Sequence, residues 1–97
     1  MLFAIVCTDK PGTARVRLDN RPAHVEFLKG LGDRLRLAGP FLTDDGEGMD
    51  GSLLVFDVAD RAEAQAIAAR DPYAKAGLFE KVEIRAWKWT LKNPEDA

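Results

Sequence analysis

His24, the single histidine of the chain, has the side chain best suited to moving a proton near neutral pH, because free imidazole has a pKa of about 6.5. With about 100° between successive helical residues, it lies on the same side of a predicted helix as Phe27, Leu28 and Leu31. The pattern therefore turns His24 inward, in the first turn of that helix. Two interpretations remain open: a general acid or base, or a buried imidazole that hydrogen-bonds to the backbone.

Asp71 is the candidate partner of His24. It follows the apolar face formed by Ala64 and Ile67 by one helical turn, so we expect it to point toward the interior. A carboxylate that accepts the Nδ1 hydrogen of a histidine fixes its tautomer and stabilises the imidazolium formed when the ring takes up a proton. Asp71 also precedes Pro72, where it could cap a short helical turn. The sequence leaves both the orienting role and the capping role open.

Three further side chains could hold a small-molecule substrate. Tyr73 carries a hydroxyl that could hydrogen-bond a ligand or the pair, although packing of its ring in a buried corner explains it as well. Arg15 and Arg21 lie close before His24 and could grip a carboxylate or phenolate through two hydrogen bonds, whereas solvated surface arginines are common. Cys7 lies in an apolar run and is interpreted as a small buried hydrophobe.

The composition argues against several classes of partner and cofactor. Fourteen basic and 16 acidic residues leave a net charge of −2 with no block of like charge, which gives no support to a nucleic-acid or membrane partner. One histidine, one cysteine and scattered carboxylates match no metal-ligand spacing, and residues 44–51 match no phosphate-binding or dinucleotide-binding loop. We therefore expect neither metal nor cofactor. A single cysteine and an apolar run too short to span a bilayer favour the cytoplasm.

Apolar periodicity, interrupted by Gly and Pro, divides the chain into strands and helices. In chain order we first predict strand 2–8, followed by a helix that Asp19 or Asn20 caps and that continues to Gly39-Pro40. Strands 41–43 and 52–58 then form a hairpin. A second helix, capped by Asp60, ends near Asp71, and a short helical turn over 73–77 leads to strand 82–91. Residues 1–92 then form one domain, and residues 93–97 a flexible tail.

This order is βαββαβ, which predicts a ferredoxin-like α+β fold with a four-stranded antiparallel sheet and two helices on one of its faces. The other face carries Trp87, Trp89 and alternate residues of two strands that are apolar on both sides. A second copy of the chain, packed sheet against sheet, would cover that face and give a homodimer. The alternative is that the two tryptophans stay partly exposed over neighbouring strands.

Several short segments carry a resemblance that extends nearly from end to end. They are MLFAIVCTDKP at 1–11, RPAH at 21–24, AGP at 38–40, Gly51-Ser52, DPYAKAG at 71–77 and Leu78-Phe79. They resemble the YciI-like (YCII-related) family of the dimeric α+β barrel superfamily. The resemblance implies a sheet-to-sheet dimer and identifies His24 and Asp71 as the matching catalytic pair.

The residues and the resemblance together predict a cofactor-free acid–base enzyme, a lyase or isomerase of dehydrochlorinase type, acting on a small cyclic or aromatic metabolite such as a hydroxyquinone or lactone. Two alternatives stay open. In one, the same pocket belongs to a non-catalytic module that binds a small molecule or assists a pathway enzyme. In the other, His24 and Asp71 are structural and the domain acts through its surface.

Overall fold

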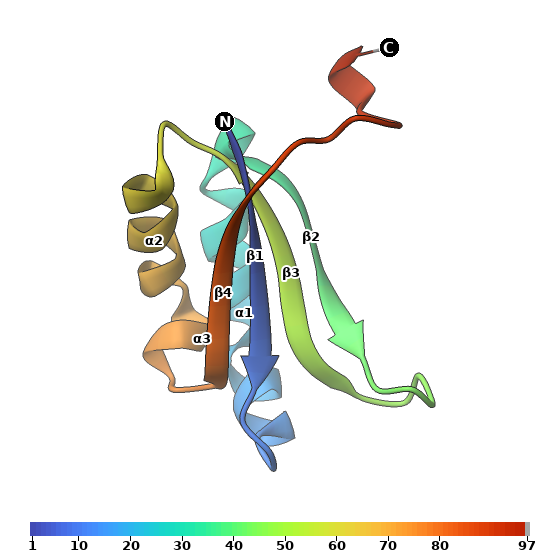
Figure 1. Cartoon of the computed structure of the whole chain (residues 1–97). Helices are drawn as coiled ribbons and strands as arrows, with labels where there is room; N and C mark the ends of the chain where they lie inside the picture. The colour runs from blue at the N-terminus through green and yellow to red at the C-terminus, as the bar shows by residue number, and fades with distance from the viewer. Residues whose placement is uncertain (97) are drawn as a thin grey trace.

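The computed structural model describes residues 1–96, and its four strands form a single antiparallel sheet in the order β2-β3-β1-β4 (Figure 1). The predicted ferredoxin-like α+β fold is confirmed. In chain order the elements are β1 (Leu2–Asp9), α1 (Ala14–Lys29), η1 (Gly32–Arg34), β2 (Leu35–Leu42), β3 (Met49–Asp57), α2 (Arg61–Arg70), α3 (Pro72–Lys75), β4 (Phe79–Trp87) and η2 (Pro94–Asp96).

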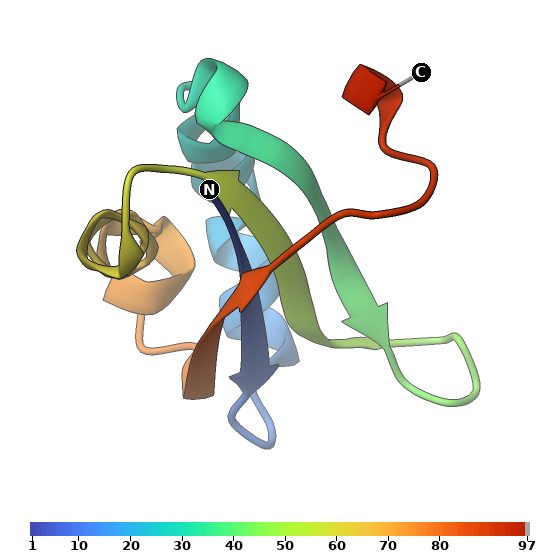
Figure 2. The ribbon, with the colours of Figure 1, turned by 45° about the horizontal axis from the view of Figure 1, so that its top comes forward.

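The hydrophobic core lies between the sheet and helices α1 and α2, which cover the same face (Figures 1 and 2). Alternate residues of β1, namely Phe3, Ile5 and Cys7, point into it because side chains of a strand alternate between faces. Small Ala64 on α2 is fully buried and lets that helix lie close to the sheet. The side chain of Asp60 accepts a hydrogen bond from the Glu63 N–H at 2.9 Å, which confirms the predicted cap of α2.

Helix α1 begins earlier than the sequence predicts, at Ala14 with Thr13 before it, so the expected start at Asp19 or Asn20 is wrong. Pro22 consequently lies inside the helix, not in its first turn. The first half of α1 was missed because the residue that it buries is Arg17, a charged side chain that apolar periodicity cannot detect.

The predicted continuation of this helix to Gly39-Pro40 is also wrong, because α1 ends at Lys29 and β2 already begins at Leu35. Gly32 adopts a φ of 58°, a left-handed conformation that ends regular helix at little cost only for glycine. Leu31 and Leu35 have helical spacing, yet Leu31 follows the end of α1 and packs in the core, and Leu35 is the first residue of β2. The hairpin between β2 and β3 is confirmed, with a longer first strand than 41–43.

The last strand spans Phe79–Trp87 instead of 82–91, and it is paired along β1 with an irregularity at Thr8 and Asp9. Trp89 therefore lies beyond the strand, where its ring is 5.6 Å from that of Trp87. The following segment passes over the end of the sheet toward β2 (Figure 2), and Arg36 donates to Asn93 Oδ1 at 2.8 Å. Flexibility of residues 93–97 stays a prediction, and Ala97 lies outside the described residues.

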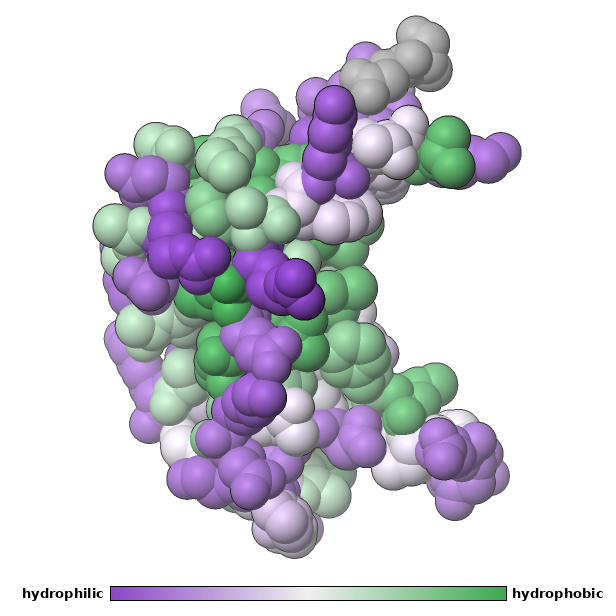
Figure 3. Space-filling view, in the orientation of Figure 1, coloured by the Kyte–Doolittle hydropathy of each residue, from purple (hydrophilic) through white to green (hydrophobic). Residues whose placement is uncertain are grey.

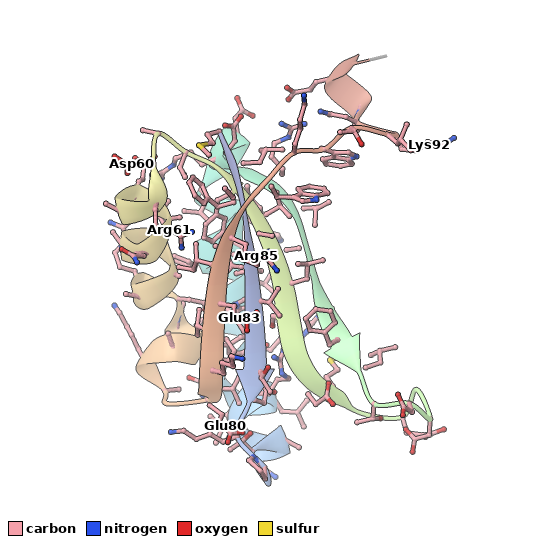
Figure 4. The ribbon with its side chains drawn as sticks, viewed as in Figure 1. Asp60, Arg61, Glu80, Glu83, Arg85 and Lys92 are labelled. Atoms are coloured by element: carbon pink, nitrogen blue, oxygen red, sulfur yellow. The ribbon has the colours of Figure 1, made fainter. Side chains whose placement is uncertain are left out.

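The face of the sheet opposite α1 is apolar over β1, β3 and β2 and charged along β4. Figure 3 shows a hydrophobic hollow beside a hydrophilic column, with the tail and the β2–β3 hairpin projecting at its two ends. Glu83 and Arg85, labelled in Figure 4, belong to the charged column. Pairing places Val6 opposite Leu53 and Ala4 opposite Val55 on the apolar part. An antiparallel sheet with one open face usually carries polar residues there, and the apolar middle of this face departs from that pattern.

Candidate functional site

His24 and Asp71 form a buried pair between the helices. The Nδ1 atom of His24 lies 2.8 Å from Oδ1 and 3.0 Å from Oδ2 of Asp71. His24 is carried by the C-terminal half of α1, not by its first turn, and Asp71 lies at the junction of α2 and α3. Since Asp71 is 1% exposed and His24 8%, water competes little for this interaction. A carboxylate in this position accepts the Nδ1 hydrogen and leaves the lone pair on Nε2.

Asp71 also performs the capping role that the sequence suggested. Its Oδ1 accepts a hydrogen bond from the Tyr73 N–H at 2.9 Å, at the start of α3, with Pro72 in the first helical position. One carboxylate therefore caps α3 and contacts the imidazole. The cap fixes the carboxylate, so it also fixes the direction from which Asp71 approaches His24.

Tyr73 lies flat against the imidazole. The two ring centroids are 3.9 Å apart and the ring planes differ by 14°. The Phe79 ring packs edge-on against the Tyr73 ring, with the two centroids 6.1 Å apart. Tyr73 is 1% exposed. Burial raises the pKa of its hydroxyl, and the positive charges of Arg17 and Arg21 oppose that rise. Both uses suggested for Tyr73 are thus compatible with the structure: its ring packs, and its side chain lines the pocket beside His24.

Arg17 and Ser52 are the residues of the site that the sequence analysis missed. Arg17 donates through Nε and Nη2 to the two carboxylate oxygens of Asp9 at 2.8 and 2.9 Å, and through Nη2 to Ser52 Oγ at 3.0 Å. Its guanidinium carbon lies 4.7 Å from the centre of the Tyr73 ring. The available signal was an aspartate directly after a buried strand and an arginine eight residues later, which is weak without knowledge of their contact.

The Arg17 guanidinium stays charged in this buried position. Burial by itself would lower its pKa, but the hydrogen bonds and the negative charge of Asp9 raise it above the ordinary arginine value. Gly51 makes room for the arrangement, because a side chain at this position of β3 would collide with the backbone carbonyl of Cys7. Glycine therefore allows β3 to bring Ser52 beside β1 and Arg17.

A pocket of about 200 Å³ opens beside this cluster, between α1 and the β2–β3 hairpin. Its walls combine apolar residues with a few polar groups, the composition typical of small-molecule sites. The lining residues are Arg17, Arg21, His24, Val25, Leu28, Lys29, Leu35, Ala38, Gly39, Pro40, Met49, Ser52 and Tyr73.

Four of the five predicted site residues meet at the pocket. The pocket is lined by His24, Tyr73 and Arg21, and Asp71, which is not in the lining, contacts the Nδ1 atom of His24. Arg15 does not reach the pocket, because it projects from another side of α1 and donates to Asp19 Oδ1 at 3.2 Å in solvent. The cations that the pocket offers a ligand are therefore Arg17, Arg21 and Lys29.

Cys7 is 2% exposed in β1. Burial raises the pKa of its thiol from 9.0 to about 12, with a further contribution from the Asp71 carboxylate and opposition from Arg17. This environment disfavours the thiolate, which is the reactive form of cysteine. Cys7 therefore fits the predicted role of a small buried hydrophobe.

The raised pKa of Cys7 predicts a loss of stability in alkali. The thiol's contribution is complete below the unfolded value of 9.0 and is lost as pH rises toward about 12, because the unfolded chain releases the proton first. We expect the urea midpoint of the native protein to fall more between pH 7 and pH 10 than that of Cys7→Ala. Equal falls for both proteins would contradict the prediction.

Within residues 1–96, no three His, Cys, Asp or Glu side chains gather in a way that could hold a metal ion. In the same part of the chain, none of the helices is long and apolar enough to cross a membrane.

Comparison with known proteins gives the relatives of this chain. Residues 1–88 match the YCII-related domain. Protein YciI of Escherichia coli O6:H1 is 37% identical over 95 residues, which cover 91% of this chain and 97% of that protein. An uncharacterized protein of Haemophilus influenzae is 34% identical with the same coverage.

Among solved structures, the chain is similar to 5-chloro-2-hydroxyhydroquinone dehydrochlorinase (TftG) from Burkholderia phenoliruptrix AC1100 in complex with 2,5-dihydroxybenzoquinone. The TM-score is 0.85 at 35% identity, over 96% of this chain and 99% of the other. The resemblance seen in the sequence is thereby confirmed: the chain belongs to the YCII-related family.

Proposed function

We propose that the pocket is a cofactor-free acid–base site, in which His24 moves a proton on a small cyclic or aromatic substrate and Asp71 orients the imidazole. The single observation that carries the proposal is the buried contact of His24 Nδ1 with both Asp71 oxygens, at 2.8 and 3.0 Å, beside an open pocket. The products of such a step are those of a lyase or an isomerase. A halide or hydroxide leaves, or a double bond shifts.

The tautomer of His24 supports a role as a base. Because the carboxylate holds the Nδ1 hydrogen, Nε2 keeps its lone pair, and residues 1–96 offer Nε2 no hydrogen-bond partner. A proton taken from a ring carbon or hydroxyl at Nε2 creates an imidazolium, whose charge the buried Asp71 carboxylate stabilises. The same imidazolium can return the proton to a product as a general acid.

The size and walls of the pocket support a one-ring substrate. A dry cavity of about 150 Å³ accommodates benzene, and this pocket measures about 200 Å³. Leu28, Leu35 and Pro40 supply apolar surface for the faces of a ring. Arg21 and Lys29 supply positive charge for an acidic substituent such as a phenolate. The dehydrochlorinase to which the chain is similar was solved with a quinone of this size.

The experiment is a turnover assay on the substrate class named by that relative. We expect the protein to release chloride from 5-chloro-2-hydroxyhydroquinone and to form the corresponding hydroxyquinone, followed by ion chromatography and absorbance. A lactone with an acidic ring hydrogen serves as the second substrate class, with mass-neutral isomerisation followed by NMR. If compounds of both classes bind but are recovered unchanged, the site is a non-catalytic binding module.

We further propose that the apolar open face of the sheet packs against the same face of a second copy. The argument is the composition of that face: it is hydrophobic at the half-buried Val6 and Leu53, whereas the charged residues collect along β4 at one edge. A two-fold axis brings the same patch of both copies together, so it can bury this apolar middle against its counterpart. The homodimer implied by the family resemblance places this face inside.

Leu53→Asp tests the dimer. Leu53 is half-buried on the open face, so a carboxylate there is desolvated if two sheets meet, and we expect the variant to elute as a monomer while the native protein elutes as a dimer at micromolar concentration. Light scattering gives the two masses. Gln65→Asp, an exposed position on α2, is the control and should stay dimeric. A native protein of monomeric mass would refute the proposal.

A further inference from the structure

Ser52 holds a hydroxyl hydrogen that the fold does not use. It is 2% exposed on β3 and lines the same pocket as His24. Its Oγ accepts the hydrogen bond from Arg17 Nη2 at 3.0 Å, so its own hydrogen points elsewhere. Residues 1–96 supply no acceptor for that hydrogen. A buried donor without a protein acceptor at the wall of a pocket is available to a ligand.

Arg17 adds positive charge at the same place. Its Nε and Nη2 atoms are occupied by Asp9 and Ser52, and the guanidinium also interacts with the Tyr73 side chain. Arg17 lines the pocket and Asp9 does not. A ligand in the pocket can therefore contact the Arg17 guanidinium and the Ser52 hydroxyl, whereas the Asp9 carboxylate that pairs with Arg17 lies outside the pocket.

The neighbouring ring fixes where this pair of donors lies relative to the proton-transfer group. Arg17 lies over the Tyr73 ring at 4.7 Å, and Tyr73 in turn stacks on His24 at 3.9 Å. The order along the wall is guanidinium, phenol ring, imidazole. A one-ring ligand that places an oxygen at Ser52 and Arg17 can thus present another of its atoms to His24.

We infer that Ser52 and Arg17 form an oxyanion subsite, which binds the ionised oxygen of a phenolate or enolate through the Ser52 Oγ–H and the positive charge of the Arg17 guanidinium. The inference rests on the proposed function, because it names the substrate group that the acid–base site handles. Negative charge that develops on this oxygen when His24 removes a proton is stabilised by donors already in place. Asp9 offsets much of the arginine charge, so the subsite favours a single delocalised charge over a phosphate.

The test uses 4-nitrophenol, a one-ring phenol that changes colour on ionisation, and needs no turnover. We expect the native protein to bind the phenolate in preference to the phenol, so that the pKa of the bound dye, read from its absorbance, is lower than in free solution. Ser52→Ala should weaken phenolate binding about tenfold, the effect expected for a hydrogen bond to a charged group. Binding of 4-nitroanisole, which has the same ring but cannot ionise, should be unchanged.

Two controls keep the outcome clear. Thr90→Ala removes an exposed hydroxyl outside the pocket and should bind like the native protein. Ser52→Cys has a side chain of similar size but only a weak donor. It replaces Ser52→Ala as the test variant if Ser52→Ala folds poorly, and it should weaken phenolate binding in the same way. Equal binding of phenolate and anisole by the native protein, or unchanged phenolate binding by both Ser52 variants, overturns the subsite.

The two proposals can fail separately. If phenolate binding depends on Ser52 but no substrate is converted, the oxyanion subsite stands and the catalytic proposal falls. If His24 is required for turnover but Ser52→Ala changes neither turnover nor phenolate binding, the acid–base site stands and the subsite falls.

Discussion

Replacing His24 by asparagine is expected to lower turnover by about 10²- to 10⁴-fold, the contribution of a positioned acid or base. Asparagine keeps a polar side chain of similar length but has no atom that accepts a proton near neutral pH. The contacts proposed for the substrate with Arg17, Arg21 and Ser52 are untouched, so KM should change little while kcat falls. Steady-state kinetics on the substrate found in the turnover assay measures the two separately.

Asp71 allows its two roles to be separated by a pair of variants. Asp71→Asn keeps an oxygen that can accept from the Tyr73 N–H, so the cap of α3 survives, but its NH₂ group favours the tautomer with hydrogen on Nε2. Asp71→Ala loses the cap as well. We expect both to lose turnover, and only Asp71→Ala to lose about 1 kcal/mol of helix stability in addition. Full activity of Asp71→Asn would show that the contact with His24 is structural.

The fold was predictable where local pattern and tertiary position agree. Strand β1 was predictable because residues 2–8 form a short apolar run that Asp9, Lys10, Pro11 and Gly12 interrupt, and α2 was predictable because Asp60 caps an alanine-rich face. The β2 strand was hidden because Leu31 and Leu35 also fit a helical period. Its register depends on pairing with β3, a contact across the sheet that no local window contains.

The candidate site was predictable in its titratable pair and in two lining residues, Tyr73 and Arg21, but not in Arg17 and Ser52. His24 and Asp71 could be placed from their positions on inward helical faces, and the structure brings them within 2.8 Å. Arg17 and Ser52 have the residue types of ordinary surface positions, and their burial becomes intelligible only once Asp9 is placed beside them. A buried polar residue is explained by its partners, and these partners come from β1, α1 and β3.

The ion pair of Arg17 with Asp9 gives the largest expected effect on stability. Both side chains are about 5% exposed, and removing one member of a buried pair leaves the other charged without compensation, at a cost of about 3–5 kcal/mol. Asp9→Asn should therefore lower the free energy of unfolding by this amount in urea titrations. The matched control is Asp19→Asn, which breaks the exposed Arg15 pair on the same helix and should cost less than about 0.5 kcal/mol.

A double variant then separates the cost of an orphaned charge from the worth of the pair. Asp9→Leu combined with Arg17→Met removes both charges and fills the space with apolar atoms, so we expect it to regain much of the stability that Asp9→Asn loses. The same variant lacks the Arg17 guanidinium and should bind phenolates poorly even when it is well folded. If Asp9→Asn is as stable as Asp19→Asn, then Arg17 reaches solvent in the folded protein and the buried network is wrong.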